Sequence, residues 1–184
     1  IAAIAIIVIV VAVGAGVYLY ISQQPTAPTP PEKPKITEIK IGLVEPLTGA
    51  HSIFGVEAKV GAEIAIEHIN EAGGIKNLGG AKLVLVVEDS QDTVDGAKLA
   101  AQRLVAVEKV PILLGCYISR HTLGMLEVTD PAGVIAVIDG LVDYLTEQGF
   151  KYVFRVAPKQ SIHAESAVEF VHDIAKKKGI DIKR

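Results

Sequence analysis

The sequence is poor in the residues that mark disulfide-stabilised and nucleic-acid-binding proteins. It has one cysteine, Cys116, no tryptophan, 5% aromatic residues and a net charge of -3. A single cysteine cannot form an internal disulfide framework, so the hydrophobic core must stabilise the fold. Because basic residues are not in excess and aromatic platforms are scarce, we expect no nucleic-acid partner.

Polar side chains are also scarce at the beginning of the chain. Residues 1–21 contain no charged or amide side chain. At about 1.5 Å per residue, a helix of this length can cross a hydrocarbon core of about 30 Å. Tyr18 and Tyr20 lie near its end, where aromatic residues gather at membrane interfaces. We therefore expect 1–21 to be a transmembrane anchor or uncleaved signal, with a cleaved signal peptide as the alternative.

Proline is concentrated in one short segment. Residues 23–35 hold five of the nine prolines and show no periodicity. Such composition favours an extended spacer without a core of its own. The sequence therefore predicts a Pro/Thr-rich linker over 22–35 between the membrane segment and a folded part over 36–184.

The folded part alternates apolar runs with helical patterns. We predict strands over 39–44, 83–87, 110–114 and 133–138, a short extended piece over 152–155, and helices over 56–72, 93–107, 119–129 and 161–178. Asp92 is the expected N-cap of the second helix. Apolar strands separated by helices predict an α/β fold with a doubly wound parallel sheet. Ligands then bind at the carboxyl ends of the strands.

Several segments resemble one known family in their order and spacing. They are IGLVEPLTGAHSIFG, AIEHINEAGGIKNLGGAKLVLVVEDSQDT, AQRLV, LLGCYIS and LTEQGFKYVFRVAP, between about residues 39 and 158. Together they resemble the type I periplasmic binding proteins of the branched-chain amino acid group. The resemblance implies two α/β lobes that close on a small solute and deliver it to an ABC transporter permease. We expect 36–184 to be the first lobe, with the second lobe following Arg184. We also expect the domain to lie on the extracytoplasmic side of a cell membrane, held by its N-terminal anchor.

The resemblance also suggests which residues contact an amino acid-like ligand. Expected contacts are Phe54 as an apolar wall and Ser119 as a partner for a carboxylate, together with Asp139, His51, Ser52 and Tyr117. Each has a plainer alternative: Phe54 in the core, Ser119 as an N-cap, Asp139 in a turn and His51 in solvent. The family has a Thr where this chain has Leu141, which puts an amino acid ligand in question.

A sensing domain and an enzyme are the two alternative functions. The same lobes serve as sensing domains of receptors, which would require a signalling segment elsewhere. Catalysis would have to rest on Cys116 with His121, but no nucleophile motif surrounds this cysteine. Metal-ligand spacings are absent, and Glu88 and Asp89 fit turn or capping roles. We therefore expect a binding protein that has no enzymatic activity, cofactor or metal.

Overall fold

The computed structural model describes residues 14, 16–20 and 36–182. The linker predicted over 22–35 and most of the anchor predicted over 1–21 lie outside these residues. Among the residues that are described, no helix is long and apolar enough to cross a membrane. Residues 36–182 belong to one compact unit.

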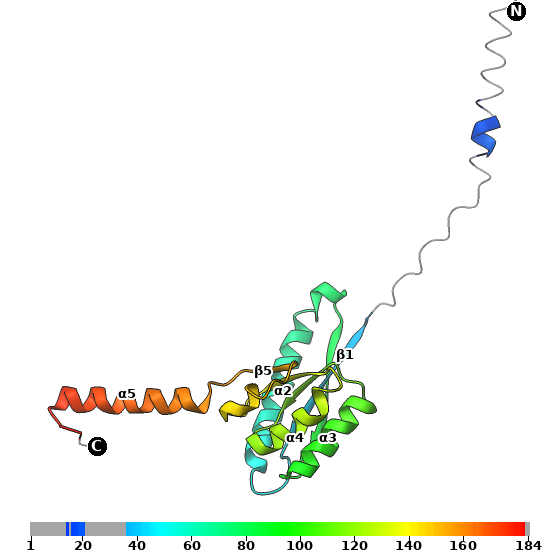
Figure 1. The fold of residues 1–184 in the computed structure, drawn as a ribbon. Coiled ribbons are helices and arrows are strands. Elements are labelled where there is room, and N and C mark those ends of the chain that lie inside the picture. The colour runs from blue at the N-terminus through cyan, green and yellow to red at the C-terminus, as the bar shows by residue number, and fades with distance from the viewer. Residues whose placement is uncertain (1–13, 15, 21–35, 183–184) are drawn as a thin grey trace, which may run out of the picture. The chain divides into compact units, whose positions relative to one another are not determined.

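The folded unit is built on a five-stranded parallel sheet (Figure 1). Its strands are β1 (Glu38–Glu45), β2 (Lys82–Asp89), β3 (Ile112–Gly115), β4 (Ile135–Ile138) and β5 (Val153–Arg155). Their order is β2-β1-β3-β4-β5, and every neighbouring pair is parallel. The register aligns the carboxyl ends, since Val44 pairs with both Glu88 and Gly115. This topology confirms the predicted α/β fold and parallel sheet.

Three α-helices lie in the connections between strands and a fourth follows β5, while the chain places β2 on one side of β1 and β3, β4 and β5 on the other. The helices are α2 (Ser52–Glu71), α3 (Val94–Ala106), α4 (Ser119–Thr129) and α5 (Gln160–Lys178), with two short 3₁₀ helices, η1 (Lys76–Leu78) and η2 (Asp143–Thr146). Right-handed crossovers place α2 on one face of the sheet and α3 and α4 on the other. Figure 1 shows α3 and α4 side by side, and the two helices pack against each other.

The main core lies between the sheet and the α3–α4 pair. Leu104, Leu113, Met125 and Leu126 are fully buried there. Gly42 of β1 lies beneath this layer, and a β-carbon at Gly42 would lie 3.1 Å from the Leu104 side chain. Side chains of a strand alternate between faces, so the odd-numbered residues of β1 face α2. Glu45 is therefore on the α2 face, at the carboxyl end of the strand.

The α2 face is covered less completely. Gly55 is the one buried residue of α2, and Val56, Val60 and Ile64 of this helix are exposed. In α5, Ala175 alone is buried. The first residue of α5 is fixed by its backbone N–H, which donates to the Leu141 carbonyl at 2.8 Å.

Three predicted helix starts differ from the structure, and that of α5 differs by only one residue. Helix α2 begins at Ser52 rather than at residue 56, so Phe54 lies in its first turn. Thr93, not Asp92, is the N-cap of α3, because its side-chain oxygen accepts from the Gly96 N–H at 2.9 Å. The Asp92 carboxyl instead contacts the loop that follows β1.

Candidate functional site

The loop between β1 and α2 is held by two carboxylates from the neighbouring β2–α3 segment. Asp89 Oδ1 accepts from the N–H groups of Leu47 at 2.9 Å and Thr48 at 3.3 Å. Its Oδ2 accepts from the Thr48 hydroxyl at 2.7 Å. Burial raises the pKa of Asp89, but these hydrogen bonds outweigh it and leave the pKa below its ordinary value. Asp89 Oδ1 also accepts from the Gln91 N–H at 2.7 Å, which is the turn role expected from the sequence, whereas its contacts with the β1–α2 loop were not predicted.

Asp92 fastens the other end of the same loop. Its Oδ2 accepts from the Ala50 N–H at 3.0 Å, and its Oδ1 lies 2.9 Å from Nδ1 of His51. The hydrogen bond with His51 is the main reason that the pKa of Asp92 is lowered. His51 therefore has Asp92 as its partner within the lobe, and this contact helps to hold the loop in place.

Close backbone contact also fixes where α2 starts. A β-carbon at Gly55 would lie 2.2 Å from the carbonyl oxygen of Pro46, which is too close for any side chain. Glycine at this position lets the first turn of α2 approach the end of β1. As a result, Phe54 lies beside the loop that follows β3.

Two aromatic rings form a wall between these loops. The rings of Phe54 and Tyr117 are stacked, with centroids 4.5 Å apart and planes 10° apart. Both side chains are partly exposed, Phe54 at 41% and Tyr117 at 39%. An exposed stacked pair gives a rigid apolar surface suited to an aliphatic or aromatic group. This placement argues against the alternative that Phe54 fills the core.

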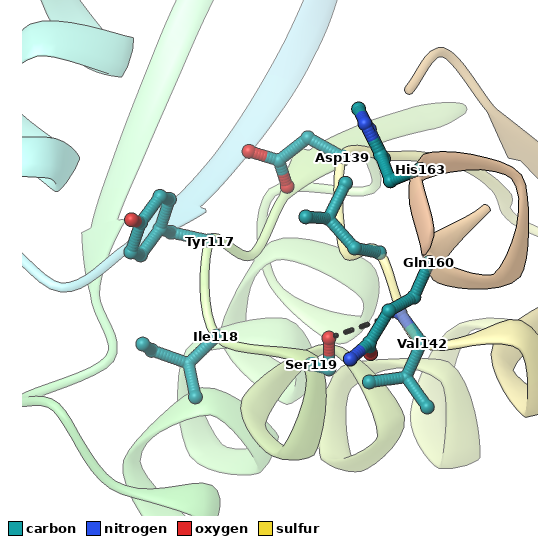
Figure 2. Close-up of a pocket in the computed structure, with 8 residues that line it drawn as sticks. Tyr117, Ile118, Ser119, Asp139, Val142, Gln160 and His163 are labelled. Carbon is teal, nitrogen blue, oxygen red and sulfur yellow. Dashed lines mark hydrogen bonds between the residues drawn. The ribbon is translucent and has the colours of Figure 1, made fainter. Parts of the chain in front are cut away.

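A pocket of about 500 Å³ lies next to Tyr117, at the carboxyl ends of β3 and β4 (Figure 2). Its lining residues come from three segments and are Tyr117, Ile118, Ser119, Asp139, Leu141, Val142, Gln160 and His163. Ser119 Oγ accepts weakly from the Val142 N–H at 3.5 Å. The N-cap of α4 is Ile118, which has no side-chain cap, so Ser119 is the first helical residue and not the N-cap.

Asp139 lies on the wall of this pocket and of a second cavity. Figure 2 shows its carboxyl pointing toward the side of the pocket where Tyr117 lies. Burial raises the pKa of Asp139, and its Oδ1 is buried without a hydrogen-bond partner among the described residues. The second cavity, of about 190 Å³, is on the α2 face and is also lined by Glu45.

Glu45 is a buried carboxyl that sequence analysis did not single out. It is 2% exposed, and its Oε2 accepts from the Tyr117 N–H at 3.0 Å. Burial, and then the charge of Asp139, raise its pKa to about 8, against the lowering effect of the Tyr117 N–H. The signal was present in the sequence as an acidic residue at the end of an apolar strand.

Two other ionisable groups near the site, Cys116 and Arg155, are held within the protein. Cys116 is fully buried, and burial followed by the charge of Glu45 raises the pKa of its thiol far above the ordinary range. Such a thiol is a poor nucleophile at neutral pH. Arg155 donates to the backbone carbonyls of Gly140 and Val142, the latter at 2.8 Å, and so holds the loop after β4. Within the described residues, no group of three or more His, Cys, Asp or Glu could hold a metal ion.

The structure brings most of the predicted residues together. Tyr117, Ser119 and Asp139 line one pocket, and the Phe54 ring stacks on Tyr117 beside it. His51 lies 6.5 Å from Tyr117, measured between ring centroids. Ser52, in contrast, begins α2 and lines none of the pockets described above.

The pocket also contains residues that the sequence did not predict. Val142, Gln160 and His163 line it. Gln160 and His163 belong to the first turn of α5, and no motif marked that turn. Leu141, which the sequence places where the resembled family has a Thr, also lines the pocket and is partly exposed.

Comparisons with known proteins agree with this geometry. The family model described as "Periplasmic binding protein" matches residues 38–181. The Leu/Ile/Val-binding protein homolog 7 of Brucella abortus is 34% identical over 152 residues, which cover 82% of this chain and 37% of that protein.

Two solved structures extend the likeness to three dimensions. The leucine binding protein LivK of Thermotoga maritima superposes with a TM-score of 0.64 at 28% identity, covering 77% of this chain and 38% of that one. The substrate binding protein LivJ of Streptococcus pneumoniae, in complex with isoleucine, gives a TM-score of 0.62 at 28% identity, covering 66% and 34%. The chain thus spans little more than a third of these relatives. On this evidence, the chain belongs to the type I periplasmic binding protein family.

Proposed function

We propose that this chain is the ligand-capturing part of an extracytoplasmic solute-binding protein that serves an ABC importer, and that its solute is a small amino acid. One observation carries the proposal. The pocket of about 500 Å³ places the Ser119 hydroxyl and the Asp139 carboxyl on the same small cavity, beside an apolar wall. An amino acid offers matching groups: a carboxylate, an ammonium and a side chain.

The anionic end of such a solute fits the start of α4. Ser119 offers a hydroxyl whose hydrogen bond with the Val142 N–H is long, at 3.5 Å. The helix has no side-chain cap, so its first N–H groups are not taken up by a side-chain acceptor. N–H groups and the positive end of the helix dipole both favour an anion at this position.

The apolar end fits the wall that Phe54 and Tyr117 form. The wall, together with Ile118 and Leu141 around the pocket, leaves room for a branched aliphatic chain. The relatives whose names mention leucine, isoleucine or valine support this class of solute. Leu141 replaces the polar group of the family pattern, so the backbone and Ser119 would have to bind the carboxylate without it.

Delivery and location follow as parts of the same proposal. A lobe that closes on its solute against a second lobe stabilises one conformation, and a permease can recognise that conformation. We propose that residues 1–21 hold the domain at the outer surface of the membrane and that the linker over 22–35 spaces it from the bilayer. Names of relatives that refer to transporters support the transport role.

The test is a titration of the ¹⁵N-labelled chain with isoleucine, in which NMR spectroscopy records the chemical shifts of the backbone amides. We expect shifts at residues 115–119 and 139–142 and weaker apparent affinity in Ser119→Ala. The control is Ser166→Ala, an exposed serine of α5 outside the pocket. No shift at these loops with any of the twenty amino acids, up to tens of millimolar, would rule out amino acid capture.

A further inference from the structure

The two carboxyl groups at the carboxyl ends of β1 and β4 have no positive partner. Neither Glu45 nor Asp139 forms an ion pair with a Lys, Arg or His among the residues that the structure describes. Nearby Arg155 is engaged with backbone carbonyls. Paired buried carboxyls without a cation are costly in their ionised form, because each charge loses hydration and repels the other.

The cavity beside them is small and otherwise apolar. Glu45 and Asp139 are the only ionisable side chains on a wall completed by Leu43, Ala58, Ala62, Leu114, Gly115, Val137 and Val156. Glu45 is almost fully buried, and Asp139 Oδ1 is buried with no partner. A buried carboxylate oxygen without a partner in the protein can accept a hydrogen bond from a donor that enters the cavity.

Asp139 connects this cavity with the larger pocket. It lines both, so a solute in the larger pocket borders a carboxyl that also lines the cavity of Glu45. We propose that Glu45 and Asp139 together bind the ammonium group of the solute and so select amino acids over simple carboxylates. This inference rests on the proposed function and adds to it a specificity-determining residue, Glu45.

A cation between the two carboxyls would offset the repulsion between their charges. An ammonium donates three N–H bonds, and the pair offers Asp139 Oδ1 and the Glu45 oxygen that does not accept from the Tyr117 N–H. Its positive charge favours the ionised form of both carboxyls, whereas burial disfavours it. Charge-assisted hydrogen bonds of this kind are stronger than those between neutral groups.

The experiment adds three small molecules in turn to the unaltered protein. They are isoleucine, 3-methylpentanoate, which lacks the ammonium group of isoleucine, and 2-methylbutylamine, which lacks its carboxylate. Amide shifts of Glu45, Tyr117 and Asp139 report occupancy. We expect isoleucine and the amine to shift these signals, and 3-methylpentanoate to bind on the order of tenfold more weakly than isoleucine. Glu45→Gln should abolish the advantage of isoleucine, while exposed Glu127→Gln should preserve it.

The outcomes separate the two proposals. Equal binding of isoleucine and 3-methylpentanoate overturns the role of the pair and leaves solute capture intact. Binding of the amine alone supports the pair and overturns amino acid capture. If no probe shifts these signals, both ideas fail. The probe series needs no mutant, so it decides the question even where Glu45→Gln impairs folding.

Discussion

The buried carboxyl of Glu45 predicts how the stability of the lobe depends on pH. Its pKa rises from the ordinary 4.5 to about 8 in the folded chain. Between these values the unfolded chain releases the proton while the folded chain keeps it. The folded state then binds more protons, so the free energy of unfolding falls as pH rises, by up to about 1.4 kcal/mol per pH unit. Above about pH 8 Glu45 is ionised in both the folded and the unfolded chain, so its effect on the free energy of unfolding no longer changes with pH.

The magnitude is large enough to measure. Over the full window the loss is on the order of 5 kcal/mol, comparable to the lower end of domain stabilities. Glu45→Gln keeps an oxygen for the Tyr117 N–H and removes the titration. We therefore expect the variant to match the parent near pH 4 and to exceed its stability by several kcal/mol at pH 9.

Urea unfolding of the 184-residue chain at pH 4 to 9 measures this difference. The difference between the two chains reports the titration of Glu45 together with its repulsion of Asp139, because more distant groups such as His121, whose pKa burial lowers, titrate in both. Glu127→Gln, on the exposed surface beside Lys98, serves as the control and should change stability by less than about 0.5 kcal/mol. Parallel pH curves for the parent and Glu45→Gln would refute the argument.

Three further results are expected. Gly55→Ala should lower the free energy of unfolding in urea by about 1–3 kcal/mol, because its β-carbon would lie 2.2 Å from the Pro46 carbonyl oxygen. Gly61→Ala is the control and should leave stability unchanged or raise it, because a β-carbon there meets open space. Equal effects of the two substitutions would contradict the close contact at Gly55. Asp89→Ala should lower the free energy of unfolding by about 1–3 kcal/mol and broaden the amide signals of residues 47–48, since the N–H groups of Leu47, Thr48 and Gln91 lose their acceptor; unchanged signals would show that the loop is held otherwise. Cys116 should resist a thiol reagent until the chain unfolds, and rapid labelling of the native chain would contradict its burial.

Much of the fold could be predicted from hydrophobic patterning. The five parallel strands follow the apolar runs, and the helix predicted over 119–129 has the same bounds in the structure. The start of α2 was predicted four residues too late, because the Gly-containing segment before Val56 was assigned to the loop, whereas Gly55 packs against Pro46 within the first turn. A contact of this kind joins the helix to its preceding loop and leaves no periodic signal.

The candidate site could be predicted only where loops follow strands directly. Tyr117, Ser119 and Asp139 come together because parallel strands align their carboxyl ends. The role of Asp92 could not be read locally, since its partners, Ala50 and His51, lie about forty residues earlier in the chain. Pairings between distant loops depend on strand order, which the sequence pattern leaves open.

The hydrogen bonds that hold the β1–α2 loop bear on any redesign of this lobe. Asp89 and Asp92 grip the loop largely through main-chain amides, those of Leu47, Thr48 and Ala50. Main-chain amides are present whatever side chains the loop carries. Side chains of this loop can therefore be replaced while both aspartates are retained, and the loop should keep its conformation.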